Sequence, residues 1–215
     1  MIPGTTAEQL LLIQDTGGLS LLASLDFVAG TYSVNGGSVS DSDVVSDVSR
    51  ISGSGFSITG TSPSVSLIND VADIIKAGNY TVVVEFFPTG TGHVILIDGL
   101  KGDNNDETVL YIDGSATLYD LHGFFDANPF AERTVFGIDV DTTDTINKVA
   151  AYRTDGVGAV SLNGETPQTD DTDAVGVIID TVYIAYKTGT AGGYIRKIDV
   201  YSGGTIADLQ TLSAP

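Results

Sequence analysis

Carboxylates are the most abundant ionisable groups of this 215-residue chain, which has 28 aspartates and glutamates against nine lysines and arginines. Retaining cleavage of a glycosidic bond needs two carboxyl groups about 5 Å apart, and alternate residues of a strand provide that separation. The glutamates stand in unrelated segments, and none has an acidic residue two positions away on a strand: Glu8, Glu85, Glu107, Glu132 and Glu165. Asp139 and Asp141 have the required spacing, but the adjoining Asp141-Thr-Thr-Asp144 segment favours a strand end running into a turn.

Other catalytic groups are scarce. The chain has no cysteine, which excludes disulfides, thiolate catalysis and cysteine-ligated zinc. His93 and His122 each stand beside a glycine, and a loop or interface position is favoured over a general base at His122. Gly53-Ser54-Gly55 and Gly90-Thr91-Gly92 lack the helix that a phosphate-binding loop requires. We therefore expect no enzymatic activity.

Oxygen ligands for a cation gather in one short segment. Calcium takes six to eight oxygen ligands, and residues 103–107 resemble the start of an EF-hand loop. However, Thr108 stands at the glycine position of that loop and Gly114 at its closing glutamate position. Residues 169–173 form a second acidic segment. Solvated turns are favoured at both, and a calcium cofactor stays an alternative with four candidate ligands: Asp103, Asn105, Asp106 and Glu107.

Aromatic, acidic and amide side chains are concentrated between residues 119 and 130, a stretch that we expect to form a loop. Aromatic rings stack on sugar faces while carboxylates and amides accept from hydroxyls, and the same composition serves subunit interfaces. Packing beneath the loop is a third alternative, and the absence of tryptophan weakens the sugar-binding one. The candidate residues for a partner or a glycan are Tyr119, Asp120, His122, Phe124, Phe125, Asp126, Asn128 and Phe130.

The formal net charge of −19 restricts the partners of the chain. A strongly acidic surface repels nucleic acids and anionic membranes, so neither is an expected partner. The first basic residue is Arg50, so the N-terminus lacks the positive region of a secretory signal. The apolar runs are too short to cross a bilayer.

The elements that position these residues are predicted to be mostly strands. Hydrophobic residues make up 42% of the chain, enough for a core, and the 26 glycines indicate many turns. The strongest predicted strand is 80–88, ending at Pro88, and Asp113-Gly114 and Asn163-Gly164 are predicted as tight turns. A dozen or so strands are expected, with short helices at 69–76 and from Thr205, where Asp208 completes a capping box. Two packed antiparallel sheets accommodate this pattern.

Several segments, in this order, resemble the laminin-G/concanavalin A-like jelly roll found on tailed-phage virion proteins. The resemblance covers residues 56–213 and rests on Tyr80–Phe86, Val94–Gly99, Lys148–Arg153, Val160–Gly164 and the closing strand and helix, Gly193–Ser213. It implies an all-β, two-sheet antiparallel jelly-roll sandwich with two short helices. It also implies a non-enzymatic virion structural protein, a head decoration, fibre or tail-associated subunit that docks on capsid or tail proteins, with a homotrimer preferred by family habit.

Residues 1–18 are expected to form an N-terminal arm ahead of a sandwich domain at 19–215. Its apolar residues could anchor the domain to a neighbouring subunit or form an edge strand on the same domain: Leu10, Leu11, Leu12 and Ile13. Two alternatives to the structural function stay open. One is a carbohydrate-binding module for host attachment, and the other, less favoured, is a glycan-degrading enzyme.

Overall fold

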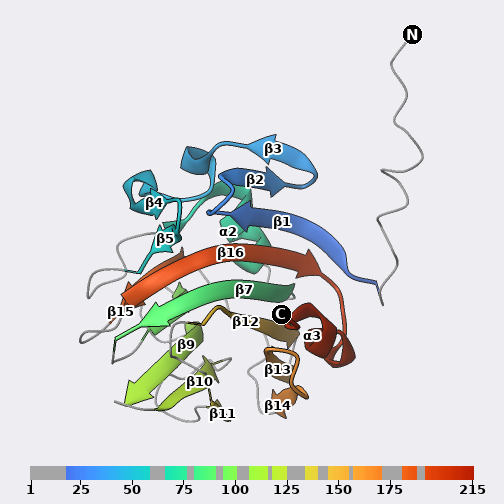
Figure 1. The fold of residues 1–215 in the computed structure, drawn as a ribbon. Helices are drawn as coiled ribbons and strands as arrows, with labels where there is room; N and C mark the ends of the chain where they lie inside the picture. The colour runs from blue at the N-terminus through green and yellow to red at the C-terminus, as the bar shows by residue number, and fades with distance from the viewer. Residues whose placement is uncertain are drawn as a thin grey trace.

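The chain folds into two antiparallel sheets packed face to face (Figure 1). The computed structural model describes residues 18–58, 66–76, 80–90, 94–100, 107–115, 118–124, 134–139, 145–154, 157–170, 181–187 and 192–215. None of the helices in these ranges is long and apolar enough to cross a membrane. The predicted all-β sandwich with two short helices is confirmed.

The larger sheet contains ten strands in the described part of the chain. Its main path runs in the order β14 (Gln168–Asp170), β13 (Val157–Leu162), β12 (Asn147–Thr154), β7 (Tyr80–Thr89), β16 (Gly192–Ser202), β1 (Ser20–Asp26), β2 (Thr31–Val34) and β3 (Gly37–Val39). The short hairpin of β4 (Ile51–Ser52) and β5 (Gly55–Ser57) pairs with one end of β16. The closing strand β16 therefore lies in the middle of this sheet, between β7 and β1 (Figure 1).

The smaller sheet contains six strands in the described residues. They run in the order β11 (Thr134–Asp139), β10 (Leu118–Phe124), β9 (Glu107–Ser115), β8 (Val94–Leu100), β15 (Thr181–Lys187) and β6 (Ser66–Leu67). Its neighbouring strands pair antiparallel throughout. The N-terminal arm predicted at residues 1–18 lies outside the described residues except for Gly18.

One hydrophobic core joins the two sheets. Alternate residues of β7, namely Val82, Val84 and Phe86, face inward with Ile198 of β16 and Ile184 of β15. Three inward phenylalanines are almost completely buried, and the Phe27 ring centroid lies 5.3 Å from that of Phe56. Burying each such side chain contributes about 1.5–3 kcal/mol, so this layer holds the sandwich together. The opposite face of the larger sheet is called the outward face below.

Both predicted helices are confirmed. Helix α2 (Asn69–Lys76) buries Val71, Ala72 and Ile75 in the main core and packs against β15. Helix α3 (Ile206–Leu212) begins with the predicted capping box, in which the Thr205 backbone N–H donates to Asp208 Oδ2 over 2.7 Å. Leu209 of α3 packs on a separate cluster of the outward face with Val83, Ala150 and Ala159. Helix α3 therefore covers one end of the outward face.

Two turn predictions have different outcomes. Asn163 and Gly164 form the expected turn with positive φ angles of 49° and 81°. Asp113-Gly114 does not form a turn, because both residues pair with β10 inside β9. A strand ladder with many partners outweighs the local preference of Asp-Gly for a turn. The strand predicted to stop at Pro88 also runs one residue further, since Pro88 and Thr89 lie opposite Gly193 and Gly192.

Candidate functional site

The outward face of the larger sheet carries a groove made of three adjoining hollows. The hollow at one end, about 310 Å³, is lined by Ser54, Phe87, Ile146, Tyr194 and Arg196. The middle hollow, about 180 Å³, is lined by Asp26, Val28, Ala29, Glu85, Arg196 and Lys197. The third, about 90 Å³, is lined by Val83, Glu85, Lys148, Lys197 and Asp199. The first and middle hollows adjoin at Arg196, and the middle and third adjoin at Glu85 and Lys197.

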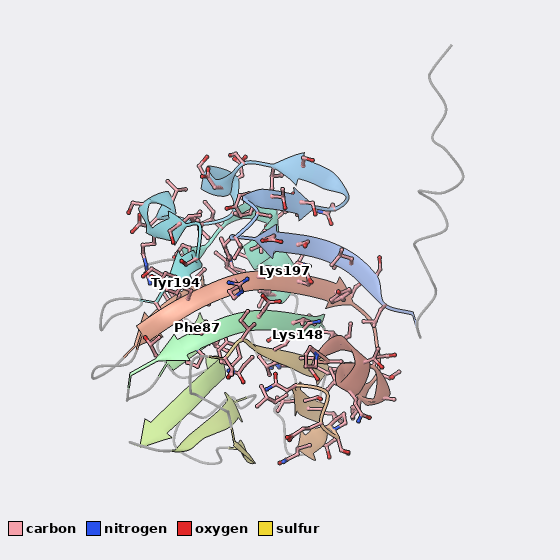
Figure 2. All side chains as sticks on the ribbon, viewed as in Figure 1. Phe87, Lys148, Tyr194 and Lys197 are labelled. Atoms are coloured by element: carbon pink, nitrogen blue, oxygen red, sulfur yellow. The ribbon has the colours of Figure 1, made fainter. Side chains whose placement is uncertain are left out.

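An aromatic pair lies at the larger end of the groove. Tyr194 of β16 lies directly opposite Phe87 of β7, and both side chains are half-buried (Figure 2). Ile146, just before β12, is 52% exposed and completes an apolar wall. Half-buried rings beside an open hollow offer a flat apolar surface to a ligand.

A β-bulge brings two cations onto the outward face. Pairing of β16 with β7 shifts register between Ile195 and Lys197, so Arg196 is the extra residue. Arg196 and Lys197 consequently line the same hollow, although adjacent residues of a regular strand point to opposite faces. The Arg196 Nε donates to Glu85 Oε1 over 2.8 Å, and the Lys197 Nζ lies 2.8 Å from Asp199 Oδ2.

Four charged residues form a row across four neighbouring strands. Lys148 of β12 lies opposite Glu85 of β7, which lies opposite Lys197 of β16, which lies opposite Asp26 of β1. The signs of the charges alternate along this charged row, an arrangement that stabilises neighbouring strands. Figure 2 shows Lys197 and Lys148 on their strands, with Tyr194 and Phe87 further along β16 and β7.

Hydrogen bonds fix the polar floor of the groove. Asp199 accepts from the Ser24 hydroxyl through Oδ1 over 2.6 Å, besides pairing with Lys197. The Asp26 carboxylate accepts from the backbone N–H groups of Val28 and Ala29, which orders the turn at the groove edge. The Lys148 ammonium donates to the Ala214 carbonyl over 3.1 Å. These hydrogen bonds hold the polar side chains that line the groove in place.

One ionisable group beneath α3 has a strongly altered pKa. Burial raises the pKa of Tyr201 to about 12, and the nearby Asp199 carboxylate adds to the shift. Tyr201 packs against the cluster that holds Leu209 of α3. The Tyr201 hydroxyl therefore stays protonated and uncharged up to about pH 12, next to the charged residues of the groove.

The residues predicted from the sequence as a partner or glycan site are only partly described. Residues 119–124 belong to β10, between β9 and β11, and not to a loop as expected. The structure gives the backbone of Tyr119, Asp120, His122 and Phe124, whereas Phe125, Asp126, Asn128 and Phe130 lie outside the described residues. The site prediction itself is therefore not tested by the structure.

Most of the other residues predicted from the sequence as site residues lie outside the described part of the chain. Glu107 is the first residue of β9, and the other calcium candidates, Asp103, Asn105 and Asp106, lie outside the described residues. The anchoring residues Leu10, Leu11, Leu12 and Ile13 also lie outside them. Within the described residues, no group of three His, Asp or Glu side chains could hold a metal ion.

The residues of the groove were not predicted from the sequence, although one feature of the sequence pointed to them. Arg196-Lys197 is the sole pair of adjacent basic residues in a chain with nine. Read as part of a regular strand, the pair would be split between the two faces. The bulge that unites it depends on the pairing with β7.

Comparison with solved structures reveals several sandwiches of this kind. Domain 4 of AbnA, an extracellular arabinanase from Geobacillus stearothermophilus solved with arabinotriose, is 15% identical over 91% of this chain and 98% of that one, with a TM-score of 0.57. A structure of botulinum neurotoxin type C, whose cell entry is dependent upon interaction with two ganglioside molecules, is 15% identical over 90% of this chain, with a TM-score of 0.58. The similarity establishes the fold.

The chain shares the two-sheet jelly-roll fold of these two structures. It spans half of the neurotoxin type C chain but nearly all of the arabinanase domain. The binding domain of botulinum neurotoxin DC, solved with rat synaptotagmin II, is 12% identical over 73% of this chain and 41% of that one, with a TM-score of 0.52. No protein-family model and no curated protein matches the sequence. Proteins with this fold thus have glycan partners in some cases and protein partners in others, so the fold alone does not determine the function.

Proposed function

We propose that this domain is a carbohydrate-binding module that holds its ligand in the groove on the outward face of the larger sheet. The observation that carries the proposal is the juxtaposition of the Tyr194–Phe87 pair with the Arg196–Glu85 ion pair. Sugars present apolar ring faces and polar rims, so their sites combine an aromatic surface with a few fixed hydrogen-bonding groups. The groove supplies both within adjoining hollows.

The geometry suits an open-ended chain of sugars. The groove extends along β7 from Val83 to Phe87, about 13 Å at a rise of about 3.3 Å per residue. It is lined on both flanks, by Ser54 and Val28 on the β1 side and by Ile146 on the β12 side. A short oligosaccharide fits this length better than a single sugar does.

The known partners of similar structures support the same function. The arabinanase domain was solved with arabinotriose, and neurotoxin type C interacts with gangliosides. These facts belong to those proteins. They favour the glycan-binding alternative raised from the sequence over a purely structural function.

The test is a glycan array followed by titration calorimetry of the strongest ligand. The Tyr194→Ala variant should bind about five- to tenfold more weakly, because loss of a stacked ring removes about 1 kcal/mol or more. The Tyr194→Phe variant keeps the ring and should stay within about threefold of the wild type. If the array shows no glycan bound by the wild-type protein, with or without Ca²⁺, the proposal is wrong.

Location on a virion stays a separate prediction from the sequence resemblance. A virion protein that binds a host glycan would combine the two, with the arm docking on capsid or tail proteins and the groove facing outward. Deleting residues 1–18 should then leave a folded domain that no longer joins particles. Full assembly of the truncated protein would contradict the anchoring arm.

A further inference from the structure

Among the described residues, the charges that line the groove balance one another, although the protein as a whole is strongly acidic. In the described part of the chain, the charged residues that line the groove are three cations, Lys148, Arg196 and Lys197, and three acids, Asp26, Glu85 and Asp199. The whole chain has 28 acidic residues against nine basic ones. One third of all its cations therefore lies in this groove, in equal number with acids.

Two of these cations are paired with carboxylates of the groove. Arg196 holds Glu85, and Lys197 holds Asp199, each over 2.8 Å. An anionic ligand would have to displace or share these carboxylates, and it would lie within reach of the Asp26 carboxylate in the middle hollow. The carboxylates of the groove would repel the negative charge of such a ligand, and this repulsion opposes its binding.

The field of the whole protein acts in the same direction. A net charge of −19 lowers the local concentration of anions and slows their association, over a range of about 10 Å at ordinary salt. The electrostatic field of the protein therefore does not attract an anionic ligand toward this groove. A neutral ligand is unaffected.

The ion pairs nevertheless leave hydrogen-bonding capacity for hydroxyl groups. The pair with Glu85 uses Nε of Arg196, and a guanidinium has further N–H donors. Lys197 has three N–H donors, of which the contact with Asp199 uses one. A sugar hydroxyl both donates and accepts, so it can lie between a cation and a carboxylate without changing the charge of the site.

From the balanced charges of the described lining residues and the two ion pairs, Arg196–Glu85 and Lys197–Asp199, we infer that the groove selects neutral oligosaccharides and discriminates against sugars that carry a carboxylate. This inference rests on the proposed glycan-binding function and specifies its ligand class. The sugar ring at one end packs on Tyr194 and Phe87, and the hydroxyls of the next units meet the charged row. An acidic sugar placed there would set four negative charges against the three positive charges of the described lining residues.

The experiment compares matched neutral and acidic glycans on the full chain. The probes are galactotriose against trigalacturonate, arabinotriose, and lactose against 3′-sialyllactose, each titrated by calorimetry beside an array that contains both classes. A neutral glycan should bind at least about tenfold more tightly than its acidic counterpart. Its Kd should change by less than about twofold between about 50 mM and about 500 mM NaCl, because no net charge is neutralised.

A variant that shifts the charge provides the internal check. Glu85→Gln leaves three cations and two acids in the groove, so the discrimination against trigalacturonate should fall by about threefold or more. Lys76→Gln, on α2 and outside the groove, is the control and should not change the preference. Wild-type binding restricted to acidic glycans overturns this inference and leaves the glycan-binding proposal in place. Absence of binding to either class on the array overturns both.

Discussion

Arg196 and Lys197 line the same hollow on the outward face of the larger sheet, although they are adjacent in one strand. The β-bulge that places them there lies opposite Glu85 of β7, which pairs with Arg196 through its side chain and with Lys197 through the strand register. Bulges interrupt a ladder locally and are common beside functional sites, where they redirect a side chain. This local irregularity in β16 creates the polar centre of the groove.

The Arg196→Gln substitution separates a binding function of this pair from a structural one. Glycan affinity should fall about tenfold, because the charged donor is lost, whereas the free energy of unfolding should change by less than about 1 kcal/mol. Calorimetric titration and urea unfolding measure the two effects. Lys76→Gln removes a more exposed ion pair outside the groove, in which Lys76 lies 3.6 Å from Asp73, and should leave affinity unchanged. Equal losses of affinity in both variants would contradict the assignment.

Gly193→Ala should strongly destabilise the sandwich. Gly193 has a φ of +116°, and an added Cβ would overlap the carbonyl oxygen of Phe87 on the neighbouring strand. Strained backbone together with a backbone clash should cost about 2–4 kcal/mol, measured by urea unfolding. Gly53→Ala is the matched control, because nothing lies within 4 Å of its added Cβ. A Gly193→Ala protein as stable as that control would show that β16 and β7 can separate locally without loss.

Ser24→Ala should reduce stability by about 1 kcal/mol, because it removes the hydroxyl that donates to Oδ1 of the largely buried Asp199. For a domain of this size, that loss lowers Tm by about 2–4 °C. Differential scanning calorimetry measures the change. The Ser24→Thr variant keeps a hydroxyl and should recover most of the loss, and no recovery would indicate that packing, not the hydrogen bond, is responsible.

Arg50→Lys should weaken the connection between the two sheets. The guanidinium of Arg50 donates to the carbonyls of Ser57 and Ala185, and its Cζ lies 4.8 Å from the centroid of the Phe56 ring. A lysine ammonium is not planar and cannot reproduce this fork, so unfolding should become easier by about 1–3 kcal/mol. Denaturant unfolding tests it, with Val48→Ala, an exposed change nearby, as the control. If the Arg50→Lys variant were as stable as the wild type, the guanidinium of Arg50 would not be needed to connect the two sheets.

Alkaline pH should destabilise the protein through Tyr201. Its pKa is raised to about 12 in the folded state, so the folded protein keeps the hydroxyl protonated where the unfolded chain, with a tyrosine pKa of about 10, loses the proton. The stabilisation is complete below about pH 10 and is lost as pH rises toward about 12. Unfolding curves between these values should show a smaller decline in the Tyr201→Phe variant. The same decline in both proteins would assign the effect to other groups.

The sequence determined the elements in which local preference and tertiary packing agree. The Thr205–Asp208 capping box, the apolar face of Leu209 in α3 and the Asn163-Gly164 turn are fixed by residues close in the chain, so their patterns were sufficient. Where partners distant in sequence compete with a local preference, the prediction failed: Asp113-Gly114 remains in β9 because β10 pairs with it.

The tertiary structure alone decided the groove. Lys148, Glu85, Lys197 and Asp26 lie on strands far apart in the sequence, and their alignment depends on the register of three separate pairings. A shift of one residue in any of them would move a side chain to the opposite face, so no local pattern contains the charged row. The closing strand could be predicted from its residues, whereas the bulge that gives it a binding surface arises only from its contact with β7.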